Sequence, residues 1–118
     1  VTIKQQLVLA FDSVPKAKVK NVIIAYEPVW AIGKNAPRPA TPDEIKEVVI
    51  FIRRVIGDIY KTNSVPPVRI IYGASVDQSN CAFIVKESGV DGLLVGRASL
   101  LPKAFNEIVT ALNDIAYD

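Results

Sequence analysis

Histidine and methionine are absent from all 118 residues of the chain, and cysteine occurs once, at Cys81. Without histidine the chain has no Ser–His or Cys–His catalytic pair of its own, and a zinc site is disfavoured because imidazole is a common zinc ligand. A single cysteine excludes an intrachain disulfide and suits a reducing compartment. We therefore expect a cytoplasmic protein that needs neither a metal nor another cofactor.

Charge and hydropathy exclude two further classes. The net charge of +2 gives no broad basic surface for nucleic acid or for an anionic membrane. No apolar run approaches the roughly 18 residues of a membrane span, and the first residues do not resemble a signal peptide. What remains is an ordinary globular composition, with enough apolar residues for one core.

Apolar residues recur with two periods along the chain. From Ile45 to Ile59 they follow the 3.6-residue spacing of a helix, and the preceding Thr41 to Glu44 supply an N-cap, a first-turn proline and a capping glutamate. The unbroken run from Val22 to Tyr26 is typical of a strand covered on both faces. The pattern predicts helices over 2–11, 42–59, 79–87 and 102–116, with Phe105, Ile108, Val109 and Leu112 on the buried face of the last, and strands over 22–26, 68–72 and 92–95.

This order predicts an α/β fold of three βα units preceded by one helix, with parallel strands joined by right-handed crossovers. Residues 1–118 show no internal domain boundary. Binding sites in parallel α/β sheets lie at the carboxyl ends of the strands. In this chain those ends are Glu27-Pro28, Tyr72-Gly73-Ala74-Ser75 and Gly96-Arg97-Ala98-Ser99.

Two of these strand ends have the residues of a phosphate cradle. Glycine lets the backbone approach an anion closely, and backbone N–H groups at a helix start can bind it. The alternative is that Gly73 and Gly96 only permit tight turns. Glu27 is either a carboxylate with a function in the site or an ordinary exposed carboxylate at the end of a strand. Trp30 and Ile32 in the following loop are either core packing or the inner face of a lid that excludes water from Glu27, with Leu94 closing from the opposite side.

Three motifs now show a resemblance. The segment Ala25 to Gly33 has the sequence A-Y-E-P-V-W-A-I-G, Arg69 to Val76 has R-I-I-Y-G-A-S-V, and Asp91 to Leu100 has D-G-L-L-V-G-R-A-S-L. In this order and spacing they resemble the triosephosphate isomerase family. The resemblance implies a partial TIM (β/α)₈ barrel comprising the end of helix 5 and strands 6–8, the C-terminal portion of an isomerase of glycolysis and gluconeogenesis. That enzyme interconverts dihydroxyacetone phosphate and D-glyceraldehyde 3-phosphate through an enediolate.

The same resemblance implies roles for individual residues. Glu27 is the expected catalytic base. The expected donors to the substrate phosphate are the backbone N–H groups of Gly33, Ser75, Gly96 and Arg97. Tyr72 is expected to bond the closed lid near Ala40, Ile32 and Leu94 to clamp the carboxylate, and Pro28, Val29 and Trp30 to form the first hinge.

The chain departs from the family pattern in its lid and at two glycines. The lid continues Gly33-Lys34-Asn35-Ala36-Pro37-Arg38-Pro39-Ala40, two residues longer than the family's G-T-G-K-T-A stretch, and its second glycine has no clear counterpart. Ala74 and Arg97 stand where the family has glycine. Neither change removes a backbone donor, but each adds a β-carbon, and Arg97 adds a cation beside the expected phosphate.

A complete barrel of this kind needs about 250 residues. The family's other catalytic groups, an asparagine and a lysine on strand 1 and a histidine on strand 4, belong to the missing N-terminal half. We therefore expect that half as a partner, a homodimeric parent, and no activity from this chain alone. A different hypothesis is a non-catalytic half-barrel that binds phosphate or assembles with another chain. A barrel enzyme of the indole-glycerol-phosphate or phosphoribosyl type is disfavoured because Tyr26-Glu27-Pro28 with Trp30 is specific to the isomerases.

Overall fold

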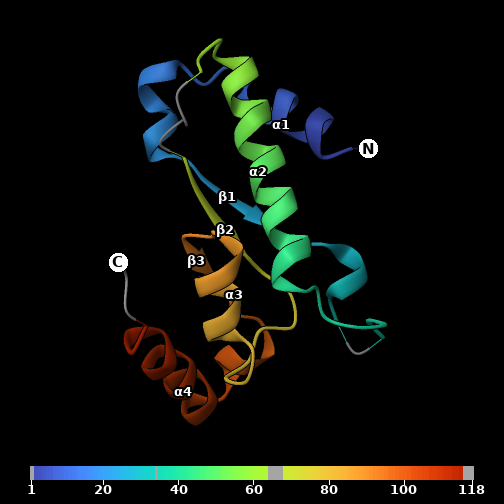
Figure 1. Cartoon of the computed structure of the whole chain (residues 1–118), viewed down its shortest axis with the longest axis vertical. Coiled ribbons are helices and arrows are strands. Elements are labelled where there is room, and N and C mark those ends of the chain that lie inside the picture. Colours follow the sequence, from blue (N-terminus) through green and yellow to red (C-terminus); the bar gives the residue numbers. More distant parts are fainter. Residues whose placement is uncertain (1, 34, 64–67, 116–118) are drawn as a thin grey trace.

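The computed structural model describes residues 2–33, 35–63 and 68–115 of the chain. Helices and strands alternate as the sequence predicts (Figure 1). In chain order the elements are α1 (Ile3–Phe11), the short 3₁₀ helix η1 (Lys16–Asn21), β1 (Ile23–Tyr26), η2 (Val29–Ala31), α2 (Pro42–Ile59), β2 (Arg69–Tyr72), α3 (Cys81–Ser88), β3 (Gly92–Leu93), η3 (Arg97–Leu100) and α4 (Pro102–Asn113).

The three strands form one parallel sheet in the order β1-β2-β3. Ile23 pairs with Arg69 and Tyr26 with Tyr72, while Gly92 pairs with Ile71. All three carboxyl ends therefore lie at the same edge of the sheet. The predicted fold class is confirmed: this is an α/β fold with the strand and helix order of a partial barrel, and the sheet of the described residues is not closed.

The longest helix, α2, starts where the sequence predicts. The Thr41 side chain accepts a hydrogen bond from the Glu44 backbone, the Glu44 side chain accepts one from the Thr41 backbone, and proline follows the cap. This capping box satisfies backbone donors that the first turn would otherwise leave unpaired. The predicted apolar stripe faces inward, with Ile45, Ile52 and Ile56 almost fully buried.

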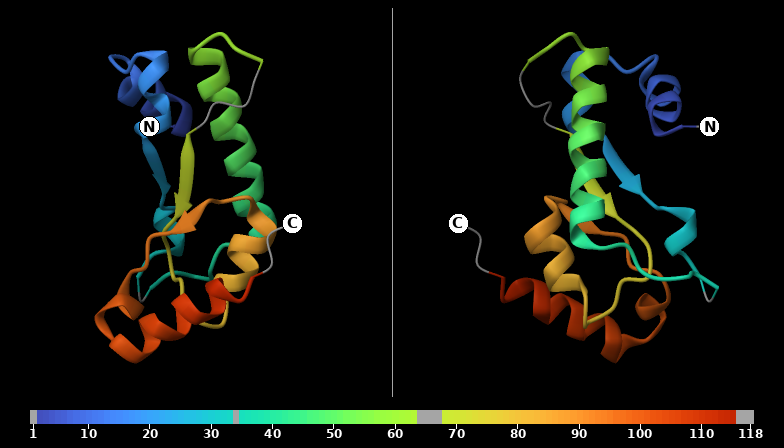
Figure 2. Two further views of the ribbon diagram at one scale, coloured as in Figure 1. Left: turned by 90° about the vertical axis from the view of Figure 1, so that its left-hand side faces the viewer. Right: turned by 45° about the vertical axis from the view of Figure 1, so that its right-hand side comes forward.

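The two sides of the sheet differ in what covers them. Figure 2 shows α2 and α3 on the same side of β1 and β2. Successive strand residues point to opposite sides, and on the side toward the helices Ile70 and Tyr72 are at most 1% exposed. We call this the helix-facing side; it carries Ile24, Tyr26, Ile70 and Tyr72. We call the other the open side; its residues are Ile23, Ala25, Arg69 and Ile71.

Two details of the prediction are wrong. The third strand ends at Leu93 rather than at Val95, because its partner β2 ends at Tyr72, opposite Leu93. On α4 only Ile108 is deeply buried, while Phe105 and Val109 are exposed. Among the described residues α4 packs mainly on α3 and η3, so one flank of its apolar stripe is uncovered. This helix ends at Asn113, and predicted helical residue 116 lies outside the described residues.

Candidate active site

A cavity of about 570 Å³ opens at the carboxyl ends of the strands. Its walls come from the three loops that follow β1, β2 and β3. The cavity brings together seven of the residues that the sequence predicts for the site: Glu27, Ile32, Gly33, Ser75, Leu94, Gly96 and Arg97.

Glu27 follows β1 directly, and its carboxylate lies beside the first residue after β2. The Gly73 backbone N–H donates to the Tyr26 carbonyl at 3.0 Å, which holds the two strand ends together. A β-carbon added at Gly73 would stand 3.1 Å from Glu27 Oε1 and equally close to the Leu94 β-carbon and carbonyl oxygen. Glycine here leaves the space that Glu27 and Leu94 occupy, a role that the turn pattern alone does not reveal.

The loop after β2 is braced by side-chain hydrogen bonds. Ser75 has φ of +40°, a left-handed conformation that is uncommon for a residue with a side chain. Its hydroxyl donates to the Ala31 carbonyl at 2.6 Å, and its own carbonyl accepts from Asn80 Nδ2 at 2.8 Å. Asp77 Oδ1 in turn accepts from the Ser79 and Asn80 backbones. Ala31 and Asn80 hold this loop in place, and the sequence patterns did not indicate either position.

The loop after β3 leads into η3. The Gly96 carbonyl accepts hydrogen bonds from the Ser99 backbone and hydroxyl. Within the described residues, the backbone N–H groups of Ser75, Gly96 and Arg97 donate to no backbone or side-chain acceptor. Unpaired N–H groups that line one cavity can bind an anion. Across that same part of the chain, Arg97 forms no ion pair.

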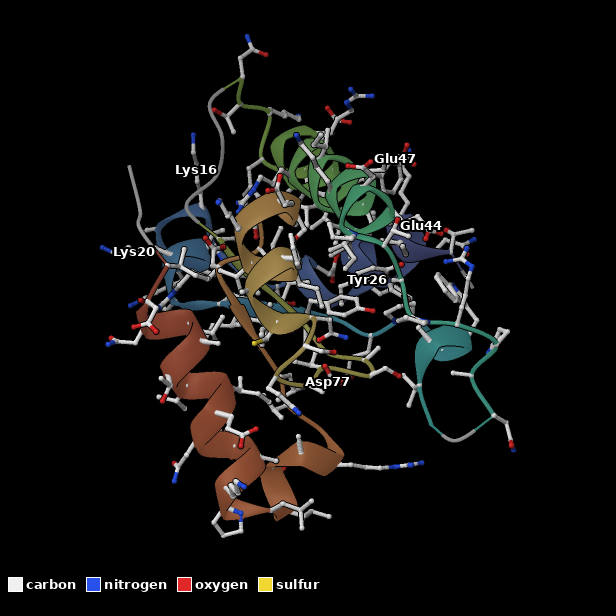
Figure 3. The ribbon with its side chains drawn as sticks, turned by 60° about the horizontal axis from the view of Figure 1, so that its bottom comes forward. Lys16, Lys20, Tyr26, Glu44, Glu47 and Asp77 are labelled. Carbon is white, nitrogen blue, oxygen red and sulfur yellow. The ribbon has the colours of Figure 1, made fainter. Side chains whose placement is uncertain are left out.

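The charges around the cavity come from few side chains. Among the described lining residues, Glu27 and Asp77 are acidic and Arg97 is the cation. In Figure 3, Tyr26 lies between the first turn of α2, which carries Glu44, and the loop that carries Asp77, whereas Lys16 and Lys20 project from another side of the molecule. A dianionic ligand would therefore meet Arg97 as its nearest described positive charge.

The segment between β1 and α2 is anchored at both ends. Ala31 and Ala40 are buried. Ile32, which lies between them, is 45% exposed, and Trp30, which precedes Ala31, is 38% exposed. Pro28, Val29 and Trp30 line a second groove of about 660 Å³ beside β1 and α1. Glu27 lines this groove as well as the cavity that contains Ser75 and Gly96, so it stands between the predicted hinge and the predicted phosphate donors.

Tyr72 lies under this segment with its ring buried. Burial, with a smaller contribution from the neighbouring Tyr26, raises the pKa of Tyr72 to about 12, although the Ala40 backbone acts in the opposite direction. The Ala40 backbone thus lies near the Tyr72 hydroxyl, and the latch between them stays a prediction.

The described residues offer no metal centre, since no group of three His, Cys, Asp or Glu side chains lies close enough together to hold an ion. Cys81 is buried, and its burial raises the pKa of the thiol. No helix among the residues searched is long and apolar enough to cross a membrane.

Known proteins of one family match almost the whole chain. A family model described as triosephosphate isomerase matches residues 1–112. A triosephosphate isomerase of Alkaliphilus oremlandii is 43% identical over 107 residues, which is 91% of this chain and 42% of that protein. Those of Mycoplasma genitalium and Emericella nidulans are 40% and 43% identical, over 90% and 92% of this chain and 43% of each relative.

The chain therefore spans about two fifths of the length of these curated relatives. The match covers all three strand ends and the cavity between them. A family model over this much of the sequence, with identities of 40% and above, shows that the chain belongs to the triosephosphate isomerase family.

Proposed function

We propose that the chain is the C-terminal portion of a triosephosphate isomerase that interconverts dihydroxyacetone phosphate and D-glyceraldehyde 3-phosphate. The observation that carries this proposal is the single cavity shared by the Glu27 carboxylate and the free backbone donors of Ser75, Gly96 and Arg97. A carboxylate at one end and an anion cradle at the other suit a short phosphorylated substrate whose carbon chain must reach a base.

In this proposal the N–H groups of Gly33, Ser75, Gly96 and Arg97 hold the phosphate. Glu27 removes a proton from the carbon beside the carbonyl of dihydroxyacetone phosphate, which leaves an enediolate, and returns the proton to the neighbouring carbon. The proton count on carbon is unchanged, and no oxidant or cofactor is consumed. Moving a proton between the two oxygens and stabilising the enediolate charge require further groups.

The loop after β1 acts as the lid. Ile32 and Leu94, which line the cavity with Glu27, exclude water from the carboxylate when the lid closes. Pro28, Val29 and Trp30 form the first hinge, and a hydrogen bond from the Ala40 backbone to the Tyr72 hydroxyl holds the closed position.

The chain contains no histidine, and electrostatic stabilisation of the intermediate is usually the largest catalytic contribution. We propose that the N-terminal half of the barrel supplies these groups, that residues 1–118 are one continuous part of that barrel, and that the whole protein is a cytoplasmic homodimer. The 118-residue chain alone is then expected to show no isomerase activity.

A fusion tests the proposal. Strands 1–5 of the Alkaliphilus oremlandii relative are joined to this chain, and isomerisation of glyceraldehyde 3-phosphate is measured. Glu27→Gln is expected to lower kcat by roughly 10³-fold or more, the loss typical of removing a general base. The matched control is Glu47→Gln, at an exposed carboxylate on α2 that does not line the cavity. Unchanged kcat in Glu27→Gln would refute the assignment of the base.

The second candidate is a non-catalytic half-barrel that binds phosphate or assembles with another chain. The exposed open side of the sheet favours it, since Ile23 is 53% exposed there. The two candidates separate when inorganic phosphate is titrated into the 118-residue chain and into the fusion. Phosphate binding by both with turnover by neither would favour the half-barrel, whereas turnover by the fusion would favour the isomerase.

A further inference from the structure

Arg38 stands between two prolines in the part of the lid that is longer than the family pattern. Proline fixes its own φ at about −65°, and Pro39 also confines the residue before it to extended conformations. The backbone around Arg38 therefore has little freedom. The backbone thus adds little to the entropic cost of holding Arg38 in place.

The Arg38 guanidinium binds the first turn of α2 in two places. Nη1 donates to Glu44 Oε1 at 2.6 Å and Nη2 donates to Glu44 Oε2 at 2.9 Å, which is a bidentate pair. Glu44 is the same residue that closes the capping box, because its Oε1 also accepts from the Thr41 backbone at 3.0 Å. Arg38 is thus fixed to the point where the lid ends and the helix begins.

The same guanidinium also contacts the start of the lid. Its Cζ lies 4.9 Å from the centroid of the Trp30 ring, within the range of a cation–π interaction. Trp30 precedes Ala31, whose carbonyl is held by the Ser75 hydroxyl. One planar group therefore touches both ends of a segment of which Ile32 and Gly33 line the cavity.

A simpler explanation is that Arg38 and Glu44 form an ordinary surface ion pair, and isolated exposed pairs contribute little. Three features argue against it. The pair is bidentate, the carboxylate is already held by the cap, and the guanidinium face is used by Trp30 at the same time. A lysine cannot reproduce this set of contacts. In the described part of the chain, no other ion pair involves residues 28–41.

We propose that Arg38 is a positioning residue that couples the two ends of the lid, so that Trp30 and the first turn of α2 respond together when the lid moves. The role of the segment as a lid over Glu27 rests on the proposed function. The coupling itself is a property of the chain without substrate, so it can be measured whether or not the isomerase assignment holds.

Trp30 is the single tryptophan of the chain and reports on the coupling directly. The measurement is the emission wavelength of Trp30 and its quenching by acrylamide in the 118-residue chain, with far-UV circular dichroism as the check on folding. In R38A the quenching constant is expected to rise by up to about twofold, because Trp30 is already 38% exposed and loses the cover of the guanidinium, with a shift to longer wavelength.

The decisive variant is E44Q. Glutamine also serves in a capping box, so α2 keeps its cap while Arg38 loses its ionic partner. We expect a smaller rise in Trp30 quenching than in R38A, because Arg38 remains but loses the carboxylate that holds its guanidinium against the ring. The double variant R38A/E44Q should behave as R38A alone, since the effect of Glu44 passes through Arg38. R38K should fall between the parent and R38A.

The matched control is R54A, at an exposed arginine of α2 with no ion pair among the described residues. It should leave Trp30 quenching unchanged. High salt gives a test without any substitution: it should raise quenching in the parent chain and have no such effect in R38A. The proposal is overturned if E44Q leaves Trp30 as in the parent, or if the effects of R38A and E44Q simply add.

Discussion

The two sides of the sheet belong to the same strands and yet have opposite surroundings. On the helix-facing side, Ile70 and Tyr72 are sealed by α2 and its neighbours, whereas on the open side Ile23 and Arg69 are exposed. Strand alternation alone predicts two classes of residue but not which class lacks a cover. The difference shows that the described residues complete one hydrophobic layer of an α/β architecture and leave the other without a partner.

The largest loss of stability is expected from a substitution on the buried, helix-facing side of the sheet. Ile56→Ala, at a side chain with no exposed surface, should lower the free energy of unfolding by about 3 kcal/mol through lost burial and a cavity. Ile23→Ala on the open side should cost less than about 1 kcal/mol. Urea unfolding followed by circular dichroism measures both, and equal losses would show that the open side is covered in solution.

A smaller effect is expected at the rim where the two sides meet. In Gly73→Ala the new β-carbon would stand 3.1 Å from the Leu94 carbonyl oxygen, a backbone atom that cannot turn away. Overpacking of this kind costs about 1–3 kcal/mol, and in the fusion it should also lower kcat because Glu27 is displaced. Gly92→Ala is the matched control, since its β-carbon meets only a side-chain methyl of Ile71. A larger loss in Gly92→Ala would contradict the expectation.

Alkaline titration of Tyr72 tests the burial of the helix-facing side without creating a cavity there. Burial raises the pKa of Tyr72 to about 12, so the fold favours its neutral form. The stability that this provides is complete below pH 10 and should be lost as the pH rises from about 10 to about 12. Tyrosinate absorbance and unfolding measured at each pH would show this step, and Tyr72→Phe should remove it. A Tyr72 that titrates near pH 10 would mean that the helix-facing side is open to water.

The smallest effect is expected at the exposed Glu44. Its hydrogen bond to Arg38, with help from the Thr41 backbone, lowers the pKa of Glu44 to about 2. The resulting stabilisation is complete above pH 4.5 and should be lost as the pH falls toward about 2. The other groups acting near it, Tyr26 and Tyr72, are neutral in this range. Glu44→Gln should lack this acid-dependent component in unfolding measurements; an identical acid profile would show that the pair adds nothing.

The sequence predicted most of the helix-facing layer, for physical reasons that act locally. The cap at Thr41 and the apolar period from Ile45 to Ile59 specify α2 without reference to the rest of the chain. The same local signals overestimated β3 and the buried face of α4. Both errors depend on neighbours: Leu93 is the last residue with a partner in β2, and Phe105 stays 38% exposed because no described element covers that flank of α4.

For the site, the sequence motifs identified the residues that line the cavity but not the contacts that hold them. The functions assigned to Glu27, Ser75 and Gly96 remain predictions. Ser75 binding to the Ala31 carbonyl, and Arg38 lying over Trp30, depend on loop conformations that no periodicity encodes. The sequence did contain a signal for the position of Arg38. An arginine that is flanked by prolines and lies shortly before a capping glutamate has few conformations in which to pair its charge.

Ser75 connects the cavity with the segment that follows β1. It lines the cavity, while its side chain donates to the carbonyl of Ala31 at 2.6 Å. Any movement that carries Ala31 away must break that hydrogen bond. In the proposed enzyme, anion binding and movement of the flap would share this one pivot.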